Sequence, residues 1–406
     1  MQEIQYVSGG ITAASGFKAA GIHCGIRRNK SKRDLALIVA DRECAAAAVV
    51  TTNHVKAAPI ILTTKHLKNG RARAILANSG NANACAPGGL EAAQKCVNTA
   101  AATLGIDAED IIVNSTGVIG QPLPVDTITS AIPILVSALS TDSAPAEEAI
   151  MTTDTFTKSV AVKCEIDGKP VIIGGIAKGS GMIHPNMATM LAFITTDCAI
   201  SPTLLKEALQ ESTNRTYNRI SVDGDTSTND MTAILASGTA CNTEITEKGT
   251  SYETFLSALN AVNLNLAKKI ARDGEGATKL ITCRVNGASD EKTATELAKS
   301  VISSSLVKAA MFGADANWGR VLCAMGYSGA NFNTNAVSIA FSSEAGHITM
   351  CEQGMGLPFD EDHAKNILTQ NEVTIEITIS EGSATAEAYG CDLTYDYVKI
   401  NGDYRT

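Results

Sequence analysis

The chain has 406 residues and a mass of 42.2 kDa, more than one compact core usually holds, so we expect two or three domain-sized units. Hydrophobic residues make up 45% of the chain and charged residues 18%, a balance that excludes a disordered protein. The formal net charge is −9, and an acidic surface repels phosphate backbones, so we do not expect general nucleic-acid binding.

The sequence shows neither a membrane segment nor a secretory signal. No apolar run approaches the roughly 18–20 residues that span a bilayer, and residues 1–5 lack a basic region followed by an apolar core. Eleven cysteines are scattered without CxxC spacing, and Cys44, Cys96, Cys164 and Cys323 stand among apolar neighbours. This pattern favours reduced, packed thiols over disulfides or a zinc site. We therefore expect a soluble, cytoplasmic protein without a metal.

The first part of the chain alternates strand and helix patterns. Residues 35–39 (LALIV) predict a buried strand, and residues 74–77 predict a second strand that runs into a polar turn at 78–81. Apolar residues recur at helical spacing from Ala93 to Leu104, and Gly105 stands where a helix C-cap belongs. These patterns indicate a mixed α and β protein.

The same alternation continues towards the middle of the chain. Residues 110–113 predict a strand that opens into a turn at 114–117 (NSTG). Residues 160–166 alternate apolar and polar side chains, and residues 171–173 are again apolar. Between them, Asp167 and Gly168 suit the positive φ angles of a tight turn, so the segment predicts a β-hairpin.

The second half repeats the mixed pattern. Ser201 and Pro202 predict a helix start, with Ser as the N-cap, and we expect Ser289 to cap a second helix. Residues 373–379 alternate as in a half-buried antiparallel strand. The fold class predicted is α/β (mixed α+β), with mixed sheets covered by helices and no recognisable linker.

The segment KGSGMIHPNMATML at residues 178–191 is the most unusual in the chain. Its glycines surround Lys178, but Lys178 precedes its glycine, so the phosphate-binding pattern GxxxxGK[ST] is absent. A non-catalytic nucleotide- or metabolite-binding protein stays an alternative. Thr189 precedes an apolar run and is either an ordinary strand residue or a nucleophile. Chain cleavage before Thr189 would free an α-amine, with a pKa of roughly 7.7–8, that could serve as its base.

Several motifs together resemble one family. Residues 178–191, 78–84 (NSGNANA), 114–120 (NSTGVIG), 150–155 (IMTTDT), 271–279 (ARDGEGATK), 313–320 (GADANWGR) and 400–404 (INGDY) resemble the self-cleaving ornithine acetyltransferase (glutamate N-acetyltransferase) family of arginine biosynthesis. The motifs occur in the family's order and span nearly the whole chain. The resemblance implies the fold that this family shares with aminopeptidase-like relatives.

The resemblance also implies an activity and a mechanism. The bond between Ala188 and Thr189 would be cut, leaving an α chain of residues 1–188 and a β chain of residues 189–406, which would assemble as an α2β2 heterotetramer. Thr189 would carry the acetyl group of N2-acetylornithine to L-glutamate through an acetyl-enzyme. Thr116 and Gly117 would form the oxyanion hole. No cofactor is implied, and the use of acetyl-CoA as a second acetyl donor stays open.

By the same resemblance, the substrate-binding residues are Thr152, Lys178, Thr189, Glu275, Asn401 and Thr406. Lys178 suits a substrate carboxylate and Glu275 a substrate ammonium. Thr153 and Thr155 compete with Thr152 for its role.

Three further interpretations complete the expectations. An amidase or aminopeptidase with the same N-terminal Thr is the alternative enzyme, because water could replace glutamate as acceptor. His184 precedes Pro185, which restricts its backbone, so we expect it to shape the cleavage loop and not to act in catalysis. Trp318 stands in a Gly/Asn-rich loop, and we expect it to serve local packing.

Overall fold

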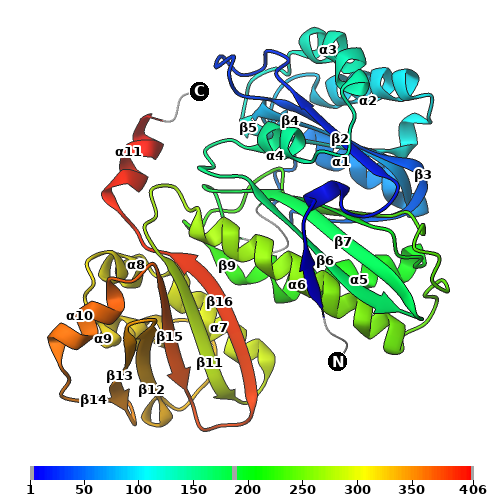
Figure 1. Ribbon diagram of the computed structural model, residues 1–406. Helices are drawn as coiled ribbons and strands as arrows, with labels where there is room; N and C mark the ends of the chain where they lie inside the picture. Colours follow the sequence, from blue (N-terminus) through cyan, green and yellow to red (C-terminus); the bar gives the residue numbers. More distant parts are fainter. Residues whose placement is uncertain (1–3, 185–189, 404–406) are drawn as a thin grey trace.

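The computed structural model describes residues 4–184 and 190–403, and within these residues the chain forms two mixed sheets covered by helices (Figure 1). The first sheet has the order β1-β6-β7-β8-β10-β3-β4-β5, and β2 pairs with β3. Its strands are β1 (Gln5–Val7), β2 (Phe17–Ile22), β3 (Leu35–Val50), β4 (Arg71–Asn81), β5 (Ile111–Val118), β6 (Lys158–Ile166), β7 (Lys169–Lys178), β8 (Leu191–Thr196) and β10 (Met231–Ala236).

The second sheet has the order β14-β13-β12-β15-β11-β16-β9 and is built from the later part of the chain. Its strands are β9 (Ile220–Ser221), β11 (Leu280–Ala288), β12 (Ser338–Ser343), β13 (Gly346–Glu352), β14 (Met355–Gly356), β15 (Glu372–Thr378) and β16 (Ala384–Cys391). The predicted fold class, α/β with mixed sheets, is therefore confirmed.

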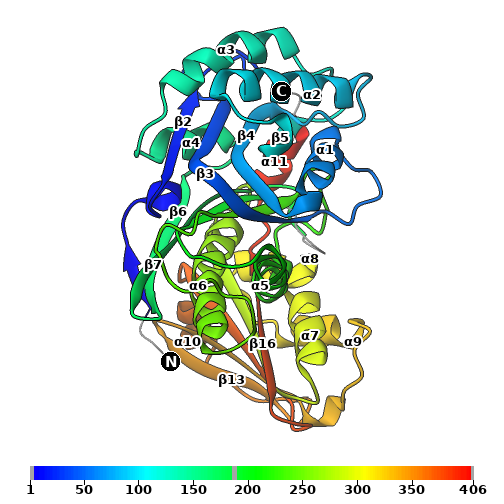
Figure 2. The ribbon, with the colours of Figure 1, turned by 90° about the vertical axis from the view of Figure 1, so that its right-hand side faces the viewer.

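The helices are α1 (Ala58–His66), α2 (Gly89–Leu104), α3 (Val125–Ser137), α4 (Ala144–Ile150), α5 (Pro202–Arg215), α6 (Thr250–Arg272), α7 (Glu291–Ser303), α8 (Ser305–Phe312), α9 (Trp318–Gly326), α10 (Glu361–Leu368) and α11 (Tyr395–Asp403). α5 and α6 lie between the two sheets (Figure 2). α11 extends from the second sheet towards the first (Figure 1). Within the described residues, none of these helices is both long and apolar enough to cross a membrane.

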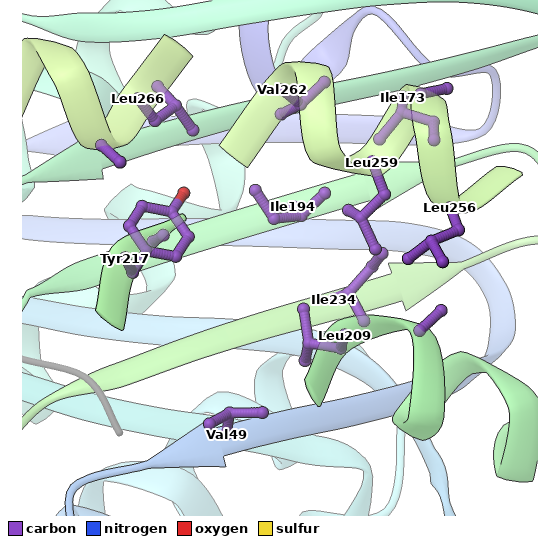
Figure 3. Packing of buried hydrophobic residues seen from close by; sticks show 14 of the residues in the cluster. Val49, Ile173, Ile194, Leu209, Tyr217, Ile234, Leu256, Leu259, Val262 and Leu266 are labelled. Carbon is purple, nitrogen blue, oxygen red and sulfur yellow. The ribbon is translucent and has the colours of Figure 1, made fainter. Parts of the chain in front are cut away.

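Two large hydrophobic clusters accompany the sheets, and the one beside the first sheet also includes Leu280, Tyr389 and Cys391 of the second sheet. Under the first sheet, apolar side chains of α5 and α6 pack onto its central strands (Figure 3). The packed side chains include Leu209, Leu259, Val262, Ile194 and Ile234, and each is buried. Burying one such side chain stabilises the folded state by about 1.5–3 kcal/mol. This packed layer therefore keeps the strand ends that form the site in fixed positions.

Several predicted elements are confirmed. α2 ends at a left-handed Gly105 with φ 68°, as the helical pattern predicts. The hairpin joins β6 to β7 through Asp167 (φ 52°) and Gly168 (φ 71°), and the Ser201 hydroxyl accepts a hydrogen bond from the N–H of Leu204 at the start of α5.

Other local predictions are wrong. The expected polar turns at 78–81 and 114–117 are strand, because β4 and β5 pair in parallel through these residues. Asp290, not Ser289, caps α7, since its carboxylate accepts the N–H of Thr293.

Three more features differ from expectation. β15 is antiparallel to β12 but parallel to β11, so it is a strand inside a mixed sheet and not a purely antiparallel one. Cys323 is exposed on α9, whereas Cys44, Cys96 and Cys164 are buried as predicted. Trp318 begins α9 instead of lying in a loop, although it packs against the second core as expected.

Candidate active site

A cavity of about 350 Å³ lies where the ends of β4, β5 and β7 meet the segments before β8 and β10. Candidate residues from widely separated parts of the sequence line it: Thr116, Gly117, Thr152, Lys178, Glu275 and Asn401. Ala188, Thr189 and Thr406 lie outside the described residues. Met190 and Leu191, which follow Thr189 in the chain, also line the cavity.

Gly117 brings the end of β5 unusually close to β4. Its φ is 133°, and a Cβ atom placed there would lie 2.4 Å from the carbonyl carbon of Gly80. A side chain is excluded on both counts, because L-residues rarely adopt this φ and real Cβ atoms do not approach carbon so closely. Because Gly117 has no side chain, the backbone around Thr116 packs closely against the end of β4 where both strands meet the cavity.

Lys178 ends β7 and places a buried ammonium in the cavity region, with 7% of its surface exposed. Burial lowers the pKa of this ammonium, and the nearby charge of Lys158 acts in the same direction. The carboxylates of Asp154, Asp230 and Glu275 oppose the shift. The site thus combines one ammonium with acidic groups, a charge pattern suited to a zwitterionic ligand.

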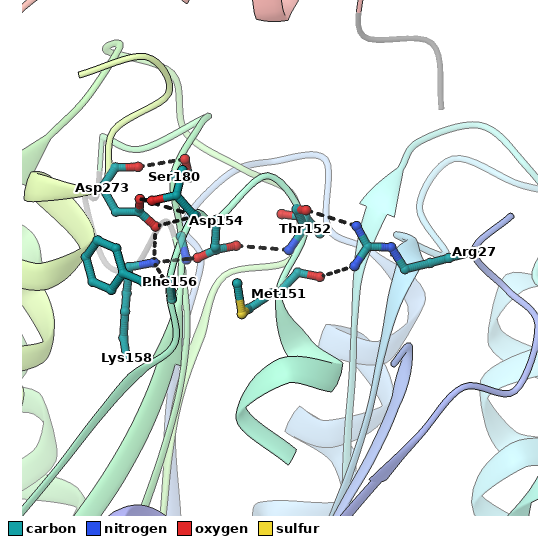
Figure 4. Close-up of polar contacts among 10 residues, drawn as sticks. Arg27, Met151, Thr152, Asp154, Phe156, Lys158, Ser180 and Asp273 are labelled. Atoms are coloured by element: carbon teal, nitrogen blue, oxygen red, sulfur yellow. Dashed lines mark hydrogen bonds and ion pairs between the residues drawn. The ribbon is translucent and has the colours of Figure 1, made fainter. Parts of the chain in front are cut away.

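Asp154 connects the segment that carries Thr152 to the residue that follows Lys178 at the end of β7 (Figure 4). One of its carboxylate oxygens accepts hydrogen bonds from Lys158 Nζ and from the N–H of Gly179, both at 2.7 Å. The other accepts the N–H of Thr152 at 2.9 Å. Burial alone would raise the pKa of Asp154, but the ammonium groups of Lys178 and Lys158 and these hydrogen bonds hold it well below its ordinary value.

Thr152 is held from a second side by Arg27. The guanidinium donates to the carbonyl oxygens of Met151 and Thr152, each at 2.9 Å (Figure 4). Of the competing threonines, Thr153 also lines the cavity, whereas the Thr155 hydroxyl donates to Asp273 instead. The structure therefore leaves Thr152 and Thr153 as the candidates on this segment.

Glu275 and Asn401 meet across the cavity wall, since Asn401 Nδ2 donates to a carboxylate oxygen of Glu275 at 2.8 Å. A Cβ atom on Gly181 would lie 2.4 Å from the Glu275 carboxylate, so this glycine leaves room for the acidic group. Gly276 has φ 70°, and a Cβ atom placed there would lie 2.7 Å from the backbone nitrogen of Tyr397. Gly181 and Gly276 thus leave room for α11 to dock against the carboxylate.

His184 is directed away from this wall. Its Nδ1 lies 3.0 Å from the hydroxyl of Ser221, and its carbonyl oxygen accepts a hydrogen bond from Thr226. Burial lowers the pKa of the imidazole to about 4. These contacts fit a role in shaping the loop, as the sequence predicts.

The sequence analysis missed residues 227–230 (STND), which line the cavity immediately before β10. Asn229 and Asp230 are both buried. The available signal was a run of polar side chains directly before an apolar strand, whereas the polar run at residues 114–117 directly follows one. Only the pairing of β10 with β8 shows that this run reaches the cavity.

In the described part of the chain, no three His, Cys, Asp or Glu side chains are grouped as a metal site requires. The eleven cysteines all fall in that part and are free thiols. The polar groups that line the cavity are hydroxyls, amides, carboxylates and one ammonium, and they stand beside apolar side chains such as Ile119, Met190 and Leu191.

The fold and the cavity define an α/β protein with a polar, charged site of a size that suits a small molecule. The sequence model of the ArgJ family matches residues 18–406, so the chain belongs to the ArgJ family. This confirms the predicted family, and the chain is an enzyme of arginine biosynthesis.

Two curated relatives match almost the whole chain. The arginine biosynthesis bifunctional protein ArgJ of Symbiobacterium thermophilum is 52% identical over 406 residues, which cover 99% of this chain and 100% of the relative. ArgJ 1 of Clostridium acetobutylicum, with the same descriptive name, is 52% identical over 398 residues, covering 98% and 97%.

A solved structure is also similar to this chain. The crystal structure of the arginine biosynthesis bifunctional protein argJ from Bacillus halodurans is 47% identical, with a TM-score of 0.51. The match covers 100% of that solved chain but 53% of this one.

Proposed function

We propose that this enzyme transfers the acetyl group of N2-acetylornithine to L-glutamate through an acetyl-enzyme on Thr189. The observation that carries the proposal is the convergence of Thr116, Gly117, Thr152, Lys178, Glu275 and Asn401 on one cavity, next to the residues that follow Thr189. Residues so far apart in sequence meet only if the folded chain builds a common site.

The proposed chemistry begins with cleavage of the bond between Ala188 and Thr189, which frees the α-amine of Thr189. This amine takes the hydroxyl proton as the Thr189 oxygen attacks the acetyl carbonyl, and it returns the proton to the departing amine of ornithine. The amine of glutamate then attacks the acetyl ester and restores the hydroxyl. Donors from Thr116 and Gly117 stabilise the oxyanion in both steps, and loss of one such donor typically costs about 3 kcal/mol.

We propose that charge complementarity orients the substrates. Lys178 binds a substrate α-carboxylate and Glu275 the side-chain ammonium of the ornithine moiety, with Thr152, Asn401 and Thr406 completing the binding site. The bond from Asn401 to Glu275 supports this assignment, because it orients the carboxylate without neutralising it.

Two observations support the division into an α chain of residues 1–188 and a β chain of residues 189–406. The β chain would hold 406 − 188 = 218 residues, about 54% of the sequence, and the solved relative matches over its full length while covering 53% of this chain. β8 also pairs with both β7 and β10, so the two pieces would stay joined in one sheet after cleavage. We propose an α2β2 heterotetramer as the assembled form.

The relatives' name, bifunctional, supports a second activity, for which we propose acetylation of glutamate by acetyl-CoA as a substrate and not as a bound cofactor. We also propose a cytoplasmic location, which the free thiols of all eleven described cysteines support.

The test combines a denaturing gel with a product assay. The purified protein should run as two bands, and the Thr189→Ala variant as one uncut band of 42 kDa without activity. Labelled acetyl from N2-acetylornithine, and separately from acetyl-CoA, should appear on glutamate. Free acetate as the main product would favour the amidase alternative, whereas an intact, inactive wild-type chain would favour a non-catalytic binding protein. Normal cleavage of Thr189→Ala would refute the mechanism.

A further inference from the structure

Asn229 lines the cavity but has no part in the chemistry described above. It lies two residues before the start of β10 at Met231 and is buried, with 4% of its surface exposed. A buried amide is costly unless its donors and acceptor are paired, so the partners of Asn229 indicate what it does.

The side chain of Asn229 joins the ends of two strands. Its Nδ2 donates to the carbonyl oxygen of Ala82, directly after β4, at 2.6 Å, and to that of Ser115 in β5 at 2.8 Å. The hydroxyl of Thr228 donates to its Oδ1 at 2.5 Å. Because a hydroxyl can donate to the oxygen and carbonyls can accept only from the nitrogen, these three bonds fix the orientation of the amide.

The bond to Ser115 fixes the backbone directly before the proposed oxyanion hole. The carbonyl of Ser115 belongs to the planar peptide unit that joins Ser115 to Thr116, so fixing this oxygen also fixes the plane from which Thr116 and Gly117 continue. The bond to Ala82 holds the strand end that contains Gly80, against which Gly117 packs. The amide of Asn229 therefore fixes both the orientation of the backbone at Thr116 and its position relative to the end of β4.

The backbone of the same segment is tied to the strand that follows Thr189. The N–H of Met231 donates to the carbonyl oxygen of Met190 at 2.9 Å, and Met231 is in register with Leu191 in the parallel pair of β10 and β8. Asn229 is two residues before Met231 in the chain. Asn229 thus links the oxyanion segment of the proposed α chain, through its amide, to β8 of the proposed β chain, through two residues of backbone.

A reciprocal bond strengthens the connection. Asn114 Nδ2 donates to the carbonyl oxygen of Asn229 at 3.1 Å, while Asn114 Oδ1 accepts the N–H of Ser115 at 2.8 Å. The Ser115 hydroxyl in turn donates to Asn78 Oδ1 at 2.6 Å. Linked buried hydrogen bonds of this kind make a local structure rigid.

We propose that Asn229 is a positioning residue that holds the Thr116 and Gly117 segment at a fixed place relative to β8, the strand that follows Thr189 in the chain; this inference rests on the proposed acetyl transfer. Oxyanion donors act only when aimed within about 0.5 Å of the productive geometry. Displacing the segment should therefore reduce kcat while substrate binding, which depends on other groups, is retained.

The test is the Asn229→Asp variant, whose carboxylate keeps the size of the amide and can still accept from Thr228 but cannot donate to the two carbonyls. We expect kcat for acetyl transfer, normalised to the cleaved fraction on a gel, to fall by about ten- to a hundred-fold, with the KM for N2-acetylornithine changed less than about three-fold. Thr228→Val, which removes only the bond to Oδ1, should fold readily and lower kcat by a smaller factor.

Asn242 provides a matched control. It is also buried, and its Nδ2 donates to the carbonyl oxygens of Ala199 and Thr243 at 3.0 and 2.8 Å, but it does not line the cavity. Asn242→Asp should lower the unfolding midpoint while leaving kcat unchanged. The inference is overturned if kcat stays within two-fold of wild type in both Asn229→Asp and Thr228→Val, or if Asn242→Asp lowers kcat equally. A wild-type protein without acetyl transfer would instead refute the proposed function.

Discussion

Lys158 and Asp273 form a fully buried ion pair across the proposed cleavage boundary, with Lys158 Nζ 2.5 Å from a carboxylate oxygen of Asp273. The same ammonium lies 2.7 Å from Asp154, so one cation is shared by two buried carboxylates. Asp154 belongs to the proposed α chain and Asp273 to the proposed β chain. The pair therefore connects the proposed α and β chains close to the segments that carry Thr152, Lys178 and Glu275.

Replacing Lys158 with Met should strongly destabilise the protein. The substitution leaves the buried carboxylate of Asp273 without its cation and that of Asp154 with the charge of Lys178 alone, and breaking such a pair from one side typically costs about 3–5 kcal/mol. The measurement is the urea midpoint in the uncut Thr189→Ala background, where a single chain unfolds. Lys95→Met serves as the control, because Lys95 pairs with Asp126 on the exposed surface and its loss should leave the midpoint unchanged. An equal midpoint for Lys158→Met would contradict the prediction.

Replacing Gly117 with Ala should disable the site. The methyl group would meet the carbonyl carbon of Gly80, so the end of β5 has to move away from β4. We expect a loss of at least a hundred-fold in kcat, as for a missing oxyanion donor, and about 1–3 kcal/mol of stability. Gly120→Ala is the matched control: Gly120 also has a positive φ, 84°, but open space around its Cα. Retained kcat in Gly117→Ala would show that the close contact is not needed.

The sequence predicts local structure well where short-range chemistry decides it. The C-cap at Gly105, the Asp167 and Gly168 turn and the start of α5 at Ser201 all depend on φ preferences or hydrogen bonds within a few residues. The polar strand ends were wrongly predicted as turns because Asn78 and Asn114 have partners that only the folded sheet supplies: Asn78 Oδ1 accepts from the Ser115 hydroxyl, and Asn114 Nδ2 donates to the carbonyl oxygen of Asn229.

The site is predictable to the extent that the family resemblance names its residues. Asn229 and Asp230 could not be identified in this way, because their importance comes from contacts more than a hundred residues away, such as the bond from Asn229 to Ser115. The buried ion pair between Lys158 and Asp273 is equally invisible to local patterns, since each residue alone looks like an ordinary surface charge.

Stability should fall as the pH drops from about 6.5 to about 4 because of His184. Its imidazole has a pKa near 6.5 when unfolded, whereas burial, aided by the charge of Lys299 and opposed by that of Asp225, lowers the folded pKa to about 4. Between these values the unfolded chain binds more protons than the folded one, so acid favours unfolding. Urea midpoints of Thr189→Ala should decline across this window, and adding His184→Gln should reduce the slope. His54→Gln, at an exposed position, should keep it. An undiminished slope without His184 would contradict the assignment.

Replacing Glu275 with Ala should raise the KM for N2-acetylornithine by about ten- to a hundred-fold. The proposed contact pairs its carboxylate with the substrate ammonium, and a hydrogen bond to a charged group is worth about 1.5–3 kcal/mol. Asn401→Ala should have a weaker effect, because it removes only the amide that orients the carboxylate at 2.8 Å. Steady-state kinetics with N2-acetylornithine varied at saturating glutamate measure both variants. An unchanged KM in Glu275→Ala would refute the ammonium contact, and a larger effect of Asn401→Ala would transfer that role to the amide.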